Sequence, residues 1–186
     1  MERDLVRRAQ AGDGEAFTML ASTLTDGLFA VAYRMLRDPG LAEDATQQAL
    51  LDAWRKLPQL RDLDRIEAWI HRLLINSCKD EIGRTRSREA KLQLLRGPER
   101  STPDGAIAVE QRDQLERAFA RLSHEHRAVV VLRHYLFWSP EEIGQALGLP
   151  AGTVASRLHY GMNALRAAIE ADARQPGASA AAGGPS

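Results

Sequence analysis

The feature that most constrains the fold is residues 139–166, SPEEIGQALGLPAGTVASRLHYGMNALR. Ser139 is a preferred N-cap, and Glu142 stands three residues later, which completes a capping box. Gly148 stands at the predicted end of this helix, where a residue in the left-handed backbone conformation is favoured. The next helix has an apolar stripe of Val154, Leu158 and Leu165. The pattern predicts a helix-turn-helix whose second helix fits a DNA major groove. An ordinary helical hairpin that binds nothing is the alternative.

Outside its apolar stripe, the second helix carries polar side chains that could contact DNA: Thr153, Ser156, Arg157, His159 and Tyr160. The whole chain of 186 residues has 25 basic and 25 acidic side chains, and neither half is strongly basic. Nucleic-acid binding must therefore come from local patches, and we expect it to be modest in affinity and sensitive to salt.

Apolar residues recur with a 3.6-residue period through long stretches, and no segment shows the alternation of a strand. We therefore expect an all-α fold of two small helical domains joined by a flexible linker. The expected parts are a first domain at 1–94, a linker at 95–108, a helix-turn-helix domain at 109–171 and a disordered tail at 172–186. The expected helices of the first domain are 2–11, 15–37, 41–57 and 66 to about 86, with a polar loop at 58–65.

The residue types argue against several classes of protein. The single cysteine, Cys78, excludes an internal disulfide framework and suits a reducing compartment. No apolar run approaches a membrane span, and the first ten residues have no signal-peptide core, so the expected location is the cytoplasm. No zinc spacing, phosphate-binding loop or nucleophile motif is present. We expect no catalysis, no cofactor, no metal and no small-molecule substrate.

Residues 41–57 form the first of two candidate interaction surfaces in the first domain. Side chains that lie close together on the predicted helix are Glu43, Asp44, Gln47, Gln48 and Leu51. A surface that mixes carboxylates, amides and an apolar residue suits docking to a basic partner helix. An ordinary solvated acidic face is the simpler interpretation of the same residues.

The second candidate surface lies between residues 60 and 88. Arg84, Arg86 and Arg88 stand at alternate positions and cannot share one helix face, which suits a fraying helix end that contacts phosphates. Asn76 could read the edge of an unstacked base, and Trp69 could offer a stacking plane. Because Trp69 falls on an apolar stripe with Leu73, we favour a core position for it.

Three stretches together resemble a known family. The segment LAEDATQQALLDAWRKL resembles the region 2 core-binding helix of bacterial sigma factors, and AWIHRLLINSCKDEIGR resembles the adjoining promoter-melting helix. Residues 121–166, which include the helix-turn-helix, resemble region 4, which reads the minus-thirty-five promoter element. The chain has no room for the extra regions of housekeeping sigma factors, so it resembles the compact extracytoplasmic-function (ECF) class.

The resemblance implies an alternative sigma factor that binds core RNA polymerase and directs promoter recognition and transcription initiation. Its partners would be core RNA polymerase, promoter DNA in duplex and single-stranded form, and an anti-sigma factor, with no membrane insertion. The residues implied to contact the polymerase are Glu43, Asp44, Gln47, Gln48 and Leu51. Those implied to contact the minus-ten element are Leu60, Arg61, Asn76, Lys79, Arg84, Arg86 and Arg88. Those implied to contact the minus-thirty-five element are Arg133, Thr153, Ser156, Arg157, His159, Tyr160 and Arg166.

The chain departs from the family pattern at a few positions. Recognition helices of the family often carry basic residues at the positions of Ala155, Tyr160 and Met162. The loss of these charges should weaken DNA binding and make it less dependent on salt. Gly144 stands where the family usually has alanine, and glycine lowers the helix propensity there by about 1 kcal/mol. Gln48 stands where the family commonly has an acidic residue. Two rival functions stay open: a plain helix-turn-helix DNA-binding regulator, and a degenerate sigma-like module that sequesters a partner.

Overall fold

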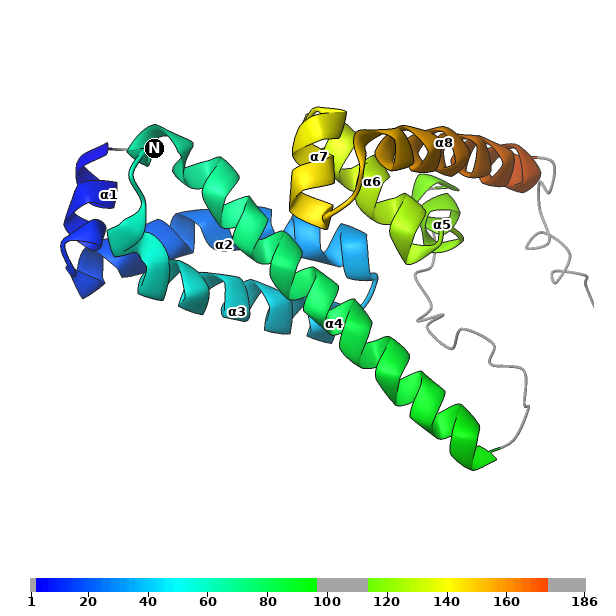
Figure 1. Ribbon diagram of the computed structural model, residues 1–186, viewed down its shortest axis with the longest axis horizontal. Coiled ribbons are helices and arrows are strands. Elements are labelled where there is room, and N and C mark those ends of the chain that lie inside the picture. The colour runs from blue at the N-terminus through cyan, green and yellow to red at the C-terminus, as the bar shows by residue number, and fades with distance from the viewer. Residues whose placement is uncertain (1–2, 97–113, 174–186) are drawn as a thin grey trace, which may run out of the picture.

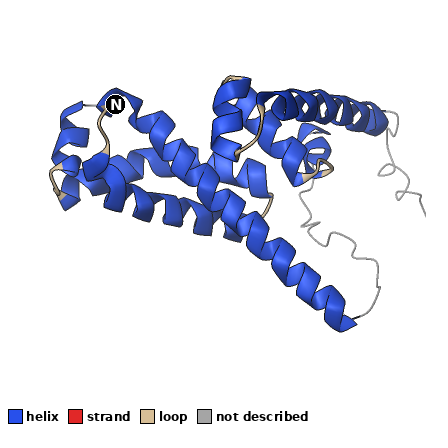
Figure 2. Cartoon of the chain, in the orientation of Figure 1, coloured by secondary structure: helices blue, strands red, loops and turns tan. Residues whose placement is uncertain are grey.

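The computed structural model describes residues 3–96 and 114–173, and every regular element in these two ranges is helical (Figure 2). The first range contains α1 (Arg3–Gln10), α2 (Gly14–Leu36), α3 (Pro39–Lys56), the 3₁₀ turns η1 (Leu57–Gln59) and η2 (Leu63–Arg65), and α4 (Ile66–Arg96). The second contains α5 (Gln114–Ala120), α6 (His124–His134), α7 (Pro140–Leu147) and α8 (Ala151–Ala173). The predicted all-α fold with two helical units is confirmed.

The N-terminal unit packs α2, α3 and α4 side by side, with α1 across one end (Figure 1). The buried stripe of α3 consists of alanines, which lets the backbones of its neighbours approach closely: Ala42, Ala45, Ala49 and Ala53. Asp13 accepts a hydrogen bond from the Ala16 N–H, and Asp38 accepts one from the Leu41 N–H, so each caps the helix that follows it. These local signals set where α2 and α3 begin.

The C-terminal unit confirms the predicted helix-turn-helix. The Ser139 hydroxyl accepts from the Glu142 N–H, the Glu142 carboxylate accepts from the Ser139 N–H, and Gly148 ends α7 at φ +70°. A Cβ at Gly144 would lie 2.7 Å from the Leu149 carbonyl oxygen, so the turn into α8 requires glycine there. This close approach explains why glycine occupies position 144 despite its low helix propensity.

The two units share one continuous apolar core, which the sequence did not predict. α2 packs against α6, and α4 packs against α7. Buried residues of both units belong to one cluster, among them Leu28, Val31, Met35, Val129, Leu132 and Ile143. The recognition unit is therefore folded back onto the first unit.

A buried arginine joins the two units. The Arg127 guanidinium is 5% exposed and donates to the carbonyl oxygens of Phe119, Ala120 and Leu122 in its own unit, and of Met35 in α2. These carbonyls lie at or just beyond the C-terminal ends of α2 and α5, where a cation is favoured. Burial, and secondarily the charge of Arg37, lower the pKa of Arg127 to about 10, so it stays charged at neutral pH.

The structure corrects several predicted boundaries. α4 continues to Arg96, about ten residues beyond its expected end, because residues 89–96 (EAKLQLLR) are strong helix formers. The predicted linker at 95–108 therefore overlaps α4, and the rest of it lies outside the described residues. The loop expected at 58–65 contains η1 and η2, and α8 runs to Ala173, past the expected start of the tail at 172. The remainder of that tail is also outside the described residues.

One described helix, α2, is long and apolar enough to cross a membrane by length and composition alone. In the folded chain α2 packs against α1, α3, α4 and α6, so its apolar composition has a role within the core.

Candidate polymerase and nucleic-acid interfaces

The predicted polymerase-facing residues lie on one exposed side of α3. They are Glu43, Asp44, Gln47, Gln48 and Leu51, which are all exposed. The Gln48 amide donates to Asp52 Oδ1 (3.0 Å), and Lys56 Nζ donates to Asp52 Oδ2 (2.8 Å). The Lys56 hydrogen bond is the main cause that lowers the pKa of Asp52. The structure thus brings these predicted residues together, and we call this surface the α3 face.

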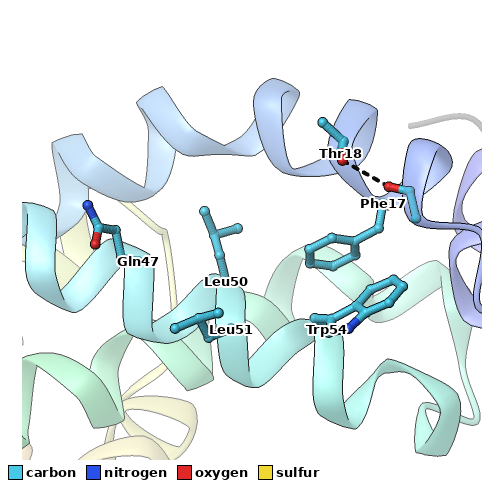
Figure 3. A pocket seen from close by; sticks show the side chains of 7 residues that line it. Phe17, Thr18, Gln47, Leu50, Leu51 and Trp54 are labelled. Atoms are coloured by element: carbon cyan, nitrogen blue, oxygen red, sulfur yellow. Dashed lines mark hydrogen bonds between the residues drawn. The ribbon is translucent and has the colours of Figure 1, made fainter.

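An apolar groove adjoins the α3 face (Figure 3). It measures about 490 Å³ and is lined by Gly14, Phe17, Thr18, Gln47, Leu50, Leu51 and Trp54. The rings of Phe17 and Trp54 form one end, with their centroids 4.9 Å apart. Trp54 is 39% exposed and Leu51 is 50% exposed. The sequence did not predict this groove, because helical periodicity cannot show where two apolar helix faces separate at the surface.

Four polar residues share one side of α4, which we call the α4 stripe: Arg72, Asn76, Lys79 and Arg86. The stripe faces the C-terminal unit. Lys79 Nζ lies 3.4 Å from the carbonyl oxygen of Ala146 in the last turn of α7. Arg72 and Asn76 line a small cavity of about 150 Å³ with Gln145 and Ala146 of α7. Arg72, four residues before Asn76 on the same side, was missed by the sequence analysis although its spacing places it there.

Other predicted minus-ten residues lie elsewhere. Arg84 forms an ion pair with the buried carboxylate of Glu81, on a different side of α4 from the stripe. Arg84, Arg86 and Arg88 all lie within continuous helix, so the predicted fraying end at these arginines is wrong. They do point to different sides, as their spacing requires.

The residues around η1 are also separate from the α4 stripe. Leu60 packs near α1, and its carbonyl oxygen accepts from the Gln10 amide at 2.7 Å. Arg61 is exposed, and neither Leu60 nor Arg61 lines the cavity at Asn76. The structure therefore does not bring these three predicted residues into one pocket. Trp69 packs against the apolar core, which confirms the favoured interpretation.

On α8, four of the predicted minus-thirty-five residues share one side: Thr153, Ser156, Arg157 and Tyr160. Tyr160 is 62% exposed, and its ring meets that of His159 edge-on. His159 lies next to this side and contacts Asn163 at 3.1 Å. Arg166 is exposed further along the helix.

Two arginines of the C-terminal unit make contacts that the sequence did not predict. Arg133 donates to the Trp138 carbonyl oxygen at 3.1 Å and so closes the turn before α7. Arg157 pairs with Glu125 of α6, 3.4 Å from Oε2. The same carboxylate pairs with Arg86 of the α4 stripe, 3.3 Å from Oε1. Sequence reasoning missed Glu125 because nothing local distinguishes it from any first-turn acid.

Comparison with known proteins decides the family. Residues 20–88 match Sigma-70 region 2, and residues 118–167 match Sigma-70 region 4. The chain is similar to the ECF RNA polymerase sigma factor SigL of Mycobacterium tuberculosis, with 38% identity over 151 residues, 77% of this chain and 82% of SigL. The chain belongs to the ECF class of RNA polymerase sigma factors. As an alternative sigma factor it directs transcription initiation.

Solved structures of other sigma factors have the same fold. CnrH, solved in complex with the cytosolic domain of CnrY, superposes with a TM-score of 0.60 and 26% identity over 91% of this chain and 97% of that chain. The sigma factor RpoE of Bartonella quintana, solved with the anti-sigma factor NepR, has a TM-score of 0.63, 23% identity, and coverage of 84% of this chain and 98% of that chain. The sigma-factor match places the α3 face and the α4 stripe within region 2, and the α8 residues within region 4.

The described residues contain no group of three or more histidine, cysteine or acidic side chains that could hold a metal ion. Cys78 is fully buried, and burial, followed by the nearby charge of Glu81, raises the pKa of its thiol to about 12. The thiol is therefore protonated at neutral pH and is a poor nucleophile.

Proposed function

We propose that this sigma factor divides promoter recognition between its two units and binds core RNA polymerase through the α3 face. Glu43 and Asp44 would meet a basic helical surface on the polymerase, with Gln47, Gln48 and Leu51 beside them. The observation that carries this proposal is the exposed α3 face with an apolar groove at its edge. Acidic contacts would orient the polymerase, and an apolar side chain in the groove would add affinity.

The α4 stripe and its surroundings would hold the single strand of the minus-ten element. Asn76 would contact an unstacked base, and the basic side chains would contact the backbone: Arg61, Lys79, Arg84, Arg86 and Arg88. Unstacking a base costs a few kcal/mol, which contacts to the base and the phosphates would offset. Leu60 would complete the base pocket only after a rearrangement that brings it toward Asn76.

The α8 residues would read the minus-thirty-five duplex in its major groove. Thr153, Ser156, Arg157, His159 and Tyr160 would face the bases, while Arg133 and Arg166 would contact phosphates. No covalent chemistry is needed for this work, so we propose a cytoplasmic protein that is not an enzyme. The co-crystal of Bartonella RpoE with an anti-sigma factor supports control of this chain by a protein of that kind.

A run-off transcription assay tests the proposal. Core RNA polymerase and this protein are added to a pool of genomic promoter fragments, and transcripts that require the protein are mapped. Discrete start sites would establish the proposed function and supply the promoter sequences. Polymerase binding without transcripts would favour the sequestering module, and duplex binding without polymerase binding would favour the simple DNA-binding regulator.

A further inference from the structure

Arg157 and Ser156 are neighbours on α8, but their side chains are held in different ways. The Ser156 hydroxyl donates to the Thr153 carbonyl oxygen of its own helix at 3.0 Å. Arg157 instead forms an ion pair with another helix, because its Nη2 lies 3.4 Å from Oε2 of Glu125 in α6. The Arg157 side chain is 27% exposed and that of Glu125 is 48% exposed, so the pair lies at the surface but is partly shielded from water.

A close approach of α6 and α8 places Glu125 beside Arg157. The two helices pack against each other (Figure 1). At Gly161, one turn after Arg157, a Cβ would lie 3.1 Å from Val130 Cγ2 and 3.3 Å from the His126 Cβ, so a side chain there would force the neighbouring groups to move. His126 directly follows Glu125 in the chain. The helices are therefore closest next to the turn that carries the ion pair.

The start of α6 fixes the backbone at Glu125. The Ser123 hydroxyl accepts from the His126 N–H at 3.3 Å and caps the helix. Glu125 stands in the first turn, where the helix dipole favours a carboxylate. Its second oxygen, Oε1, lies 3.3 Å from Nη2 of Arg86. The position of this carboxylate is therefore set by the protein itself.

A guanidinium group that is oriented in advance suits the reading of a guanine. The group has five N–H donors, so four remain when one points toward Glu125. Two donors are enough for the N7 and O6 acceptors that guanine presents in the major groove. Ordering a long side chain costs conformational entropy on binding, and a side chain that a carboxylate already holds loses less of it. The negative charge of Glu125 would also repel phosphates, which lowers the affinity for every sequence alike.

We infer that Glu125 is a positioning residue for promoter recognition, which orients Arg157 toward a guanine of the minus-thirty-five element. The inference rests on the proposed function, because it deepens the role that Arg157 has there. Glu125 itself touches no base. It raises the discrimination between sequences and lowers the general affinity for DNA. Loss of the carboxylate should therefore move these two quantities in opposite directions, whereas damage to the fold would lower both.

The test compares Glu125→Gln with the native full-length protein. The native protein first selects its preferred duplex from a random pool at low salt, which requires no polymerase. Fluorescence anisotropy then gives the affinity for this duplex and for a scrambled duplex of the same composition. We expect Glu125→Gln to bind the scrambled duplex about two- to threefold more tightly than the native protein does. The ratio of the two affinities should fall about three- to tenfold.

Glu141→Gln is the matched control. It makes the same change of charge at another first-turn glutamate, which is exposed on α7. It should leave the ratio of the two affinities as it is in the native protein. If the ratio falls as far in Glu141→Gln as in Glu125→Gln, the effect comes from general charge and the inference is overturned.

A second measurement tests whether Glu125 acts through Arg157. Each guanine of the preferred duplex is replaced in turn by 7-deazaguanine, which lacks the N7 acceptor. At one position the replacement should weaken binding by the native protein and leave Arg157→Ala unaffected. At that position the loss should be smaller in Glu125→Gln. Adding Glu125→Gln to Arg157→Ala should lower the affinity ratio no further; an additional fall of the full size would contradict the inference.

The inference and the proposed function can fail separately. If the native protein supports run-off transcription but Glu125→Gln keeps the native affinity ratio, the positioning role is wrong and the proposed function stands. If discrimination depends on Glu125 and Arg157 as expected but the protein does not bind core polymerase, the positioning role stands and the polymerase assignment is wrong. If the native protein selects no preferred duplex, base reading by α8 is wrong, and the positioning role with it.

Discussion

The α3 face and the α4 stripe belong to neighbouring helices of one small unit and are both exposed, yet it is the α4 stripe that makes polar contacts with the C-terminal unit. The α3 face offers carboxylates, amides and an apolar groove, and its five named side chains are exposed. The α4 stripe offers basic groups, and the chain supplies them with a helix C-terminus and the Glu125 carboxylate. Charge complementarity within the chain thus pairs the α4 stripe with the C-terminal unit.

The largest expected effect comes from removing the buried cation that joins the two units. Arg127→Met should destabilise the fold by about 3–4 kcal/mol, because buried carbonyl oxygens at the ends of α2 and α5 lose their donors. Urea unfolding followed by circular dichroism measures the loss. Arg133→Met is the matched control, since it removes one bond from an exposed side chain and should lose less than about 1 kcal/mol. Equal losses in the two variants would contradict the role of Arg127 in joining the two units.

The next largest effect is expected from charge reversal on the α3 face. Asp44→Arg should weaken binding to core RNA polymerase by about 2–3 kcal/mol, roughly 30- to 150-fold, while the fold stays intact. A pull-down or titration with labelled polymerase gives the affinity. Asp26→Arg places the same charge change on an exposed position of α2 and should have little effect. If Asp44→Arg binds core RNA polymerase as tightly as the native protein does, the α3 face is not the docking surface.

On α8, Arg157→Ala should weaken binding to the upstream duplex element by about 1–3 kcal/mol if Arg157 reads a base. The measurement compares duplexes that differ in that element, taken from promoters mapped in the run-off assay. A loss confined to the preferred sequence supports base reading. A uniform loss across all sequences would instead identify Arg157 as a phosphate contact.

A smaller effect on polymerase binding is expected from a change in the apolar groove beside the α3 face. Trp54→Ala should weaken polymerase binding by about 1–2 kcal/mol, because a partly exposed aromatic beside charged contacts is a typical anchor. Met19→Ala truncates a more exposed apolar side chain (58%) that does not line the groove. It should change affinity by less than about 0.5 kcal/mol. If both variants bind alike, the groove does not contribute to docking.

The smallest effect is a pH dependence of the shared core. In the folded chain the pKa of Cys78 is raised to about 12, whereas the unfolded thiol loses its proton near pH 9. The unfolded state therefore binds fewer protons above pH 9, and stability should fall by about 1 kcal/mol between pH 9 and 10. Above pH 10 the lowered pKa of Arg127 acts in the opposite direction. In Cys78→Ala the fall in urea stability over this interval should vanish; a fall that persists would assign it to other groups.

Predictions that depended on a few neighbouring residues agree with the structure. Ser139, Glu142 and Gly148 mark the ends of α7 because caps act within one turn of a helix. The exposed set on α3 follows from helical spacing alone. The end of α4 was misjudged because three arginines were read as a fraying terminus, although the residues beyond them favour helix.

The sequence by itself determined the helices, the helix-turn-helix, the family and the residues available for each surface, because these depend on local propensity and spacing. Only the tertiary structure decided which surface contacts the C-terminal unit. The bond from Arg127 to Met35 spans 92 residues of chain, and one carboxylate of Glu125 gathers arginines from two units. No periodicity encodes such contacts, because they depend on how α6 and α7 pack against α2 and α4. That packing brings the C-terminal unit beside the α4 stripe and not beside the α3 face.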